Sequence, residues 1–234
     1  MKKIIISAII ILSCLNLSAQ TKGGSFCIGV MGMGKNTWLL NQNIFDRPNS
    51  EQEVEASFGS SFGLTTSLYF TQNIGIGLDI LYATHNQKFN GIFLTIPYTS
   101  KVHLASVDIP LYLRLSTNGG AFFEIGSYFS MITASRYTGE TTDGTFKEDK
   151  DIQAFTSGFN VAPLIGFGID INLTDNLILS PAFRFSYGLS DVAGVDGQGV
   201  PLSDYPTVYP PATYEKTYTL SGGLLIGLVY RFDI

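Results

Sequence analysis

Charged residues occupy only one face of the segments that alternate in polarity between residues 58 and 232. Alternation with a period of two is typical of a β-strand, whose successive side chains point to opposite sides of the sheet. The charged positions of this face are Asp79, Asp108, Arg114, Glu124, Asp170, Arg184 and Arg231. The opposite parity is mostly Ile, Leu, Val and Phe. A soluble sheet buries its apolar face, whereas a barrel in lipid turns that face outward and its polar face inward.

The alternation is clearest in three C-terminal segments, residues 157–172, 177–189 and 217–232. In residues 177–189, large apolar or aromatic residues alternate with small residues and Arg184. Such runs rarely arise by chance. Each is long enough for the roughly 9–11 residues that a tilted membrane strand requires. The pattern therefore predicts strands that span a membrane.

We predict an all-β fold, an eight-stranded antiparallel up-and-down transmembrane barrel. Its strands lie at residues 25–33, 58–70, 75–86, 103–115, 120–133, 157–172, 177–189 and 217–232. The connections at 71–74, 116–119 and 173–176 are short, and those near 34–57, 87–102, 134–156 and 190–216 are long. This alternation indicates short periplasmic turns and long external loops. The first strand has the weakest pattern and could extend through Trp38 and Leu40, but closure in lipid requires it.

Three prolines, Pro110, Pro163 and Pro181, lie inside predicted strands. Each removes one hydrogen-bond donor from the ladder between strands. A closed barrel has no edge strand to receive them, so we expect a β-bulge at each position.

The first nineteen residues have the pattern of a secretory signal peptide. Lys2 and Lys3 precede an apolar run at residues 4–12, and cleavage after Ala19 would leave residues 20–234 as the barrel domain. The run is too short to cross a bilayer as a helix. Residues 11–14 (ILSC) also loosely resemble a lipoprotein box, so acylation of Cys14 is an alternative. If Cys14 leaves with the signal, Cys27 is the one cysteine left, and it cannot form an internal disulfide.

Composition narrows the class of protein further. The mature chain would carry 12 basic and 19 acidic residues, a formal net charge of −7, which disfavours nucleic acid as a partner. Glycine is frequent, with 25 residues, while charged residues make up 14% of the chain, and both values suit a membrane barrel. The sequence contains no phosphate loop, zinc spacing or cofactor motif, so we expect neither a cofactor nor a metal.

The seven charged residues of the inner face form the candidate site, a charge network in the lumen. Eight strands enclose a space that side chains just fill. Charges in so narrow an interior must pair with one another. We interpret the four acids and three arginines as a plug that closes the barrel. Small inward residues such as Gly77 and Gly166 leave space for the alternative, a narrow charged conduit.

An enzyme at the external rim is a further alternative. His85 and His103 flank the second long connection, but strand parity places His85 on the inner face and His103 on the outer face. Residues on opposite faces do not form a catalytic dyad or share a metal ion. We therefore expect a non-enzymatic protein.

The long connections are the expected regions of contact with partners. Residues 190–216 combine several prolines with Tyr205, Tyr209 and Tyr214, whose amphipathic rings suit contact with a protein or a glycan. A stiff lid over the barrel mouth is the alternative for this loop. Residues 134–156 are rich in acids, but their spacing matches no calcium loop, so we interpret this segment as a solvated face.

Residues 107–114 (VDIPLYLR), 120–128 (GAFFEIGSY) and 184–191 (RFSYGLSD) resemble strands of the PorT-like outer-membrane β-barrel family of Bacteroidota. The resemblance covers nearly the whole mature chain. It implies an outer-membrane barrel, and the family's namesake is implicated in protein secretion across that membrane. Residues 230–234 (YRFDI) resemble the aromatic C-terminal signal that the barrel-insertion machinery reads, although two residues follow the last aromatic.

These observations together predict a monomeric outer-membrane protein that is exported through a cleaved signal peptide. Its partners would be outer-membrane lipid, the barrel-insertion machinery and, through the external loops, a protein or a glycan. Its function would be structural or adhesive. A narrow channel or a component of a secretion system is the first alternative, and a surface enzyme is the second.

Overall fold

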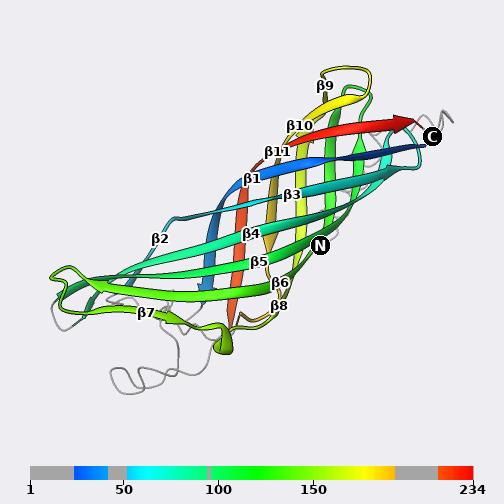
Figure 1. Cartoon of the computed structure of the whole chain (residues 1–234). Helices are drawn as coiled ribbons and strands as arrows, with labels where there is room; N and C mark the ends of the chain where they lie inside the picture. The colour runs from blue at the N-terminus through cyan, green and yellow to red at the C-terminus, as the bar shows by residue number, and fades with distance from the viewer. Residues whose placement is uncertain (1–23, 42–51, 94–95, 193–215, 234) are drawn as a thin grey trace, which may run out of the picture.

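Eight long antiparallel strands close into a ring in the computed structural model, which describes residues 24–41, 52–93, 96–192 and 216–233 (Figure 1). They are β1 (Ser25–Asn41), β3 (Ser57–Tyr69), β4 (Ile74–Phe93), β5 (Ile96–Ser116), β6 (Ala121–Thr141), β8 (Phe159–Ile169), β10 (Leu177–Tyr187) and β11 (Thr217–Asp233). Each strand pairs with its neighbour in chain order, and β11 pairs with both β10 and β1. The ring therefore has no unpaired edge.

Four short elements complete the described part of the chain: β2 (Gln52–Glu55), β7 (Lys147–Asp151), β9 (Ile171–Asn172) and a 3-10 helix, η1 (Gln153–Phe155). β2 pairs with β4, β7 with β6, and β9 with β10. No helix among these residues is long and apolar enough to cross a membrane. The predicted signal peptide, Cys14 and the loop tyrosines Tyr205, Tyr209 and Tyr214 lie outside the described residues.

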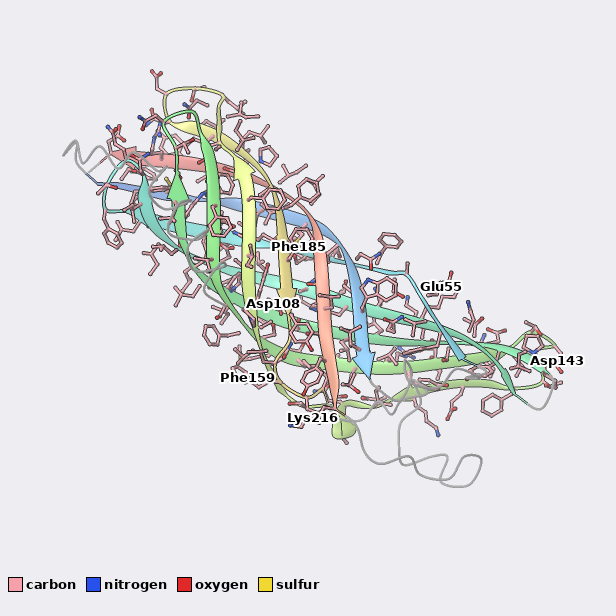
Figure 2. All side chains as sticks on the ribbon, turned by 180° about the vertical axis from the view of Figure 1, so that it is seen from behind. Glu55, Asp108, Asp143, Phe159, Phe185 and Lys216 are labelled. Atoms are coloured by element: carbon pink, nitrogen blue, oxygen red, sulfur yellow. The ribbon has the colours of Figure 1, made fainter. Side chains whose placement is uncertain are left out.

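The eight predicted strands and the three short turns between them are confirmed. β3 and β4, β5 and β6, and β9 and β10 are each joined by four residues. All three turns lie at the end of the ring where the chain enters β1 and leaves β11, because Ser25 pairs with both Asp233 and Tyr69. The outer wall of the ring carries large exposed apolar side chains, for example Phe159 on β8 and Phe185 on β10 (Figure 2).

The predicted loop at residues 87–102 is wrong. β4 continues to Phe93, β5 begins at Ile96, and the two strands pair without interruption from Leu81 and Asp108 to Phe93 and Ile96. β6 likewise continues to Thr141, and β1 reaches Asn41. Figure 1 shows β4, β5 and β6 running well beyond the other strands, with β2 and β7 beside them. We call residues 52–55, 86–93, 96–104, 134–141 and 147–151 the sheet extension.

The predicted bulges at the prolines are also wrong. The one register shift in the described ladders lies between Ala105 and Ser106 of β5, where β6 contains the extra residue Thr133. At each proline the ladder is interrupted on one side only: Pro110 is unpaired toward β4, Pro163 toward β10 and Pro181 toward β8. The opposite ladders continue in register through all three prolines. The physical reason is that the N–H group of a residue in an antiparallel strand faces one neighbour, so a proline removes one bond without inserting a residue.

Candidate functional site

The centre of the lumen is an arginine held between two carboxylates. Nη1 of Arg184 lies 2.7 Å from Oδ2 of Asp79, and its Nε lies 2.7 Å from Oε2 of Glu124. These side chains come from β10, β4 and β6, and all three are at most 2% exposed. The hydroxyl of Tyr112 donates to Oδ1 of Asp79 at 3.1 Å, and its ring lies 4.6 Å from the Arg184 guanidinium. Every charge at this level therefore has an opposite partner.

A second ion pair lies next to the first, toward the end with the short turns. Nη2 of Arg114 donates to Oδ1 of Asp170 at 2.8 Å, and its Nε lies 3.8 Å from Oε1 of Glu124. The guanidinium also packs on the ring of Phe122, 3.5 Å from the ring centre. Asp170 accepts a further hydrogen bond from the hydroxyl of Ser180. Because Glu124 contacts both arginines, the two ion-pair groups form one network.

A third group lies toward the sheet extension and includes a residue that the sequence prediction missed. The Lys35 ammonium is buried, 3.8 Å from Oδ2 of Asp108 and 3.1 Å from Nε2 of His85. Nε2 of His85 lies 3.7 Å from the same Asp108 oxygen, and Ser106 donates to Asp108 at 2.7 Å. Lys35 was missed because the predicted first strand ended at residue 33. The alternation of inward positions continues through Lys35 to residue 39 and could have identified it.

Arg231 does not join this network. It has the inward parity, but it lies at the rim of the ring, where its side chain is 33% exposed. It donates to the carbonyl of Asp175 at 3.0 Å and lies 4.0 Å from Asp233. Among the described residues, the buried network therefore contains four acids, two arginines and Lys35, together with His85, and Lys35 takes the place expected for Arg231.

The space opposite the inward glycines is filled by large side chains. A Cβ atom on Gly77 would lie 2.3 Å from the ring of Tyr112. On Gly166 it would lie 2.8 Å from Oε2 of Glu124 and 3.1 Å from Cγ of Arg184. These glycines therefore allow bulky polar side chains to cross the lumen, and they do not leave a conduit at these two positions.

The two ends of the lumen differ. Beyond the charged network, toward the sheet extension, buried apolar side chains form a cluster. It consists of Leu39, Phe89, Val102, Leu104, Ile132, Tyr137, Ile152 and Val192. At the opposite end, a cavity of about 760 Å³ lies among the short turns, and Cys27, Tyr69, Asp170 and Arg231 contribute to its lining. In the described part of the chain, the interior is thus apolar toward the sheet extension and contains a cavity at the end with the short turns.

The polarity of the two faces reverses along β4, β5 and β6. At the level of the network, β4 carries Asp79 inside and Ile80 outside, but further along it carries Phe89 inside and Lys88 outside. On β5 the inner residue changes from Asp108 to Val102. The wall that faces outward is thus apolar around the ring and polar around the sheet extension. This reversal indicates where the surrounding lipid ends.

The two histidines lie on opposite faces of the sheet. His85 points into the lumen beside Lys35 and Asp108. His103 lies on the outer face, where its Nδ1 is 2.6 Å from Oδ1 of Asn86. In the part of the chain that the structure describes, no three His, Cys, Asp or Glu residues are arranged to hold a metal ion.

A closed ring of eight antiparallel strands with an apolar outer wall and a charged interior defines a transmembrane β-barrel. The chain belongs to the outer membrane protein beta-barrel domain family, whose model matches residues 19–194. Membership of this family places the protein in the outer membrane. The match ends before β11, the strand that closes the ring between β10 and β1.

Several solved structures of outer-membrane barrels are similar to this chain. Neisserial surface protein A is 13% identical, with a TM-score of 0.40, and the match covers 90% of this chain and all of that one. OprG from Pseudomonas aeruginosa is 13% identical, with a TM-score of 0.36 and coverage of 91% and 98%. The outer membrane protease OmpT from Escherichia coli is 11% identical, with a TM-score of 0.43 and coverage of 93% and 99%. No curated protein matches the chain.

Proposed function

We propose that the protein is a closed, non-enzymatic outer-membrane barrel that presents the sheet extension and its adjoining loops to a protein or glycan partner. The observation that carries this proposal is the position of Arg184, which lies 2.7 Å from carboxylate oxygens of both Asp79 and Glu124. Charges this deeply buried are tolerated when they are paired, and the paired side chains occupy the lumen. The proposed protein is a monomer, exported through a cleaved signal peptide and inserted by the barrel-insertion machinery.

The apolar cluster supports the same proposal from the other side of the network. Phe89, Val102 and Leu104 are at most 2% exposed and pack where a conducting barrel needs a polar mouth. The charge network and the apolar cluster therefore fill the lumen at two successive levels along the barrel axis. In this proposal the function lies in the sheet extension and the loops, because side chains fill the lumen at the levels of the charge network and the apolar cluster.

Conductance in planar bilayers tests the closed state. We expect no steady single-channel current from the full-length protein, and none from Lys147→Gln, a control in the sheet extension. Steady currents whose amplitude changes in Arg184→Met would overturn the proposal, because they would place the ion path through the network.

Lipid and peptide hydrolysis assays test the absence of an enzyme. Turnover that disappears in His85→Ala or His103→Ala would contradict it.

A role in secretion, which the resemblance to PorT-like barrels implies, is the second candidate. The observation that favours it is the cavity of about 760 Å³ at the end with the short turns, which would receive a segment of another protein from the periplasm. A photo-crosslinking residue in place of Asn118, which lines this cavity, tests it. Crosslinks to a periplasmic protein would support this role, and crosslinks that form only to lipid would exclude it.

A further inference from the structure

Four basic side chains gather on the outer face of the sheet extension. Lys88 lies on β4, Lys101 and His103 lie on β5, and Arg136 lies on β6. The strand register places Lys88 directly opposite Lys101, and His103 directly opposite Arg136. We call these four residues the basic patch.

The basic patch lies beyond the apolar outer wall of the barrel, and on β4 Thr84 and Asn86 lie between the wall and Lys88. On β4 the last large apolar residue of that wall is Tyr82, which is 45% exposed, and on β6 it is Met131, which is 46% exposed. On β5, the outward positions toward the sheet extension are Val107, then Ala105, then His103. His103 is therefore the first polar residue of the outer face beyond the wall. Lysine and arginine at such a boundary keep their apolar stems along the membrane and their charges at the headgroups. The basic patch is therefore placed at the surface of the lipid layer.

Protein acids balance the two ends of the basic patch and leave its centre positive. Nζ of Lys88 lies 2.7 Å from Glu55 of β2. Arg136 binds Asp149 of β7 through two nitrogens, at 2.5 and 2.6 Å. Glu140, the other nearby acid on β6, pairs with Lys147 at 3.6 Å.

Lys101 lies between these two pairs. It is exposed, and no acid among the described residues pairs with it. Like charges directly opposite each other on neighbouring strands destabilise a sheet. Glu55 offsets part of this repulsion at Lys88, and an anion beside Lys101 would offset the rest.

We propose that the basic patch binds the phosphate group of a phosphorylated lipid in the outer leaflet. Lys101 supplies the central charge, and Lys88 and His103 flank it on either side of the phosphate. The lipid's acyl chains then lie on the apolar wall below, beside Tyr82 and Val107. This inference requires the outer-membrane location, which the family shows, and it does not depend on whether the lumen is closed.

Native mass spectrometry of the full-length barrel in zwitterionic detergent tests the inference. The probes are diphosphoryl lipid A and the same lipid without its phosphates. We expect the wild-type protein to prefer the phosphorylated lipid, and Lys101→Gln to bind it about fivefold more weakly, the effect of one cation near an anionic lipid surface. Lys101→Arg keeps the charge and is expected to restore binding. Lys216→Gln is the matched control, because it removes the same charge at an exposed site outside the basic patch.

Three results would overturn the inference. The first is equal binding of the phosphorylated lipid by wild type and Lys101→Gln, with circular dichroism showing that both are folded. The second is equal affinity of wild type for the lipids with and without phosphate. The third is displacement of the lipid by inorganic phosphate at the same concentration, or binding of heparin in preference to lipid, because either would assign the basic patch to another anion.

Discussion

The ring and the sheet extension are built from the same strands, yet they arrange polarity in opposite ways. Within the ring, β4 carries Asp79 inside an apolar wall, and within the sheet extension it carries Phe89 inside a polar wall. The period of two is unchanged, so the surrounding medium accounts for the difference. Outer-face side chains that contact lipid are apolar, and those that contact water are polar or charged.

The ion pairs of the two regions differ in the same way. Arg184 and its two carboxylates are almost fully buried, whereas Arg136 and Asp149 have side chains that are 63% and 45% exposed. Removing one partner of a buried pair leaves a charge that water cannot reach. Removing one partner of an exposed pair returns the other to solvent. The regions should therefore respond very differently to similar substitutions.

The largest effect is expected from Arg184→Leu. This substitution leaves Asp79 and Glu124 without their shared cation and should lower the free energy of unfolding by about 3–5 kcal/mol. The measurement is a denaturant titration of the barrel in lipid vesicles. Arg136→Leu in the sheet extension is the control and should not shift the midpoint. Equal losses in the two variants would contradict the contrast between the regions.

Neutralising the carboxylates as well sharpens this test. The triple variant Arg184→Leu, Asp79→Asn, Glu124→Gln removes the unpaired charges, so it should recover part of the stability that the single variant loses. A triple variant that is less stable than Arg184→Leu would show that the loss comes from packing against Tyr112 and not from charge.

The second effect is expected in the sheet extension alone. Phe89 is fully buried in the apolar cluster, and Phe89→Ala removes a side chain whose loss typically costs about 3–5 kcal/mol in a well-packed core. The sheet extension should open locally while the ring stays closed. Limited proteolysis should therefore cut the variant within residues 86–104 and leave a protected barrel. Ile92→Ala, at an exposed position of the same strand, is the control.

The third effect is a clash inside the lumen. Gly77→Ala places a methyl group against the ring of Tyr112, and overpacking of this kind typically costs about 1–3 kcal/mol. Gly34→Ala is the control, since a Cβ atom at that position meets no atom within 4 Å. A neutral Gly77→Ala would mean that Tyr112 can move, and the lumen would then be less tightly filled than the structure indicates.

The strands of the ring and the inward face of the charge network could be predicted because both follow from local alternation. The sheet extension could not, because the prediction looked for apolar residues on the outer face, and beyond Asn86 that face becomes polar. Lys35 was missed for a related reason, since the small residues Gly32 and Gly34 weaken the outward pattern of β1. Strand parity predicted that Arg231 lies on the inner face of the barrel. Parity does not show the position of a residue along the barrel axis, so it could not show that Arg231 lies at the rim of the ring. The pairing of Arg184 with Asp79 depends on strand stagger, which alternation does not specify.

The smallest effect is expected from the exposed pair of the sheet extension, where it can be followed by pH. The hydrogen bond from Arg136 holds the pKa of Asp149 below its ordinary value. The pair therefore stabilises β7 above the ordinary aspartate pKa, and this contribution is lost as the pH falls through the lower pKa of the folded state. Because both groups are exposed, salt should weaken the pair at neutral pH.

Hydrogen exchange of the β7 amides measures this effect. Protection should be constant from neutral pH down to the ordinary range of aspartate and should fall only below it, after correction for the intrinsic pH dependence of exchange. Asp149→Asn should lower protection at neutral pH and remove the acid-dependent step. Asp143→Asn is the control, because the pKa of Asp143 is lowered by the hydroxyl of Thr145 and not by a cation. If protection of β7 were lost while Asp149 is still ionised, the Arg136 pair would not hold this strand, and its pairing with β6 would depend on the backbone ladder alone.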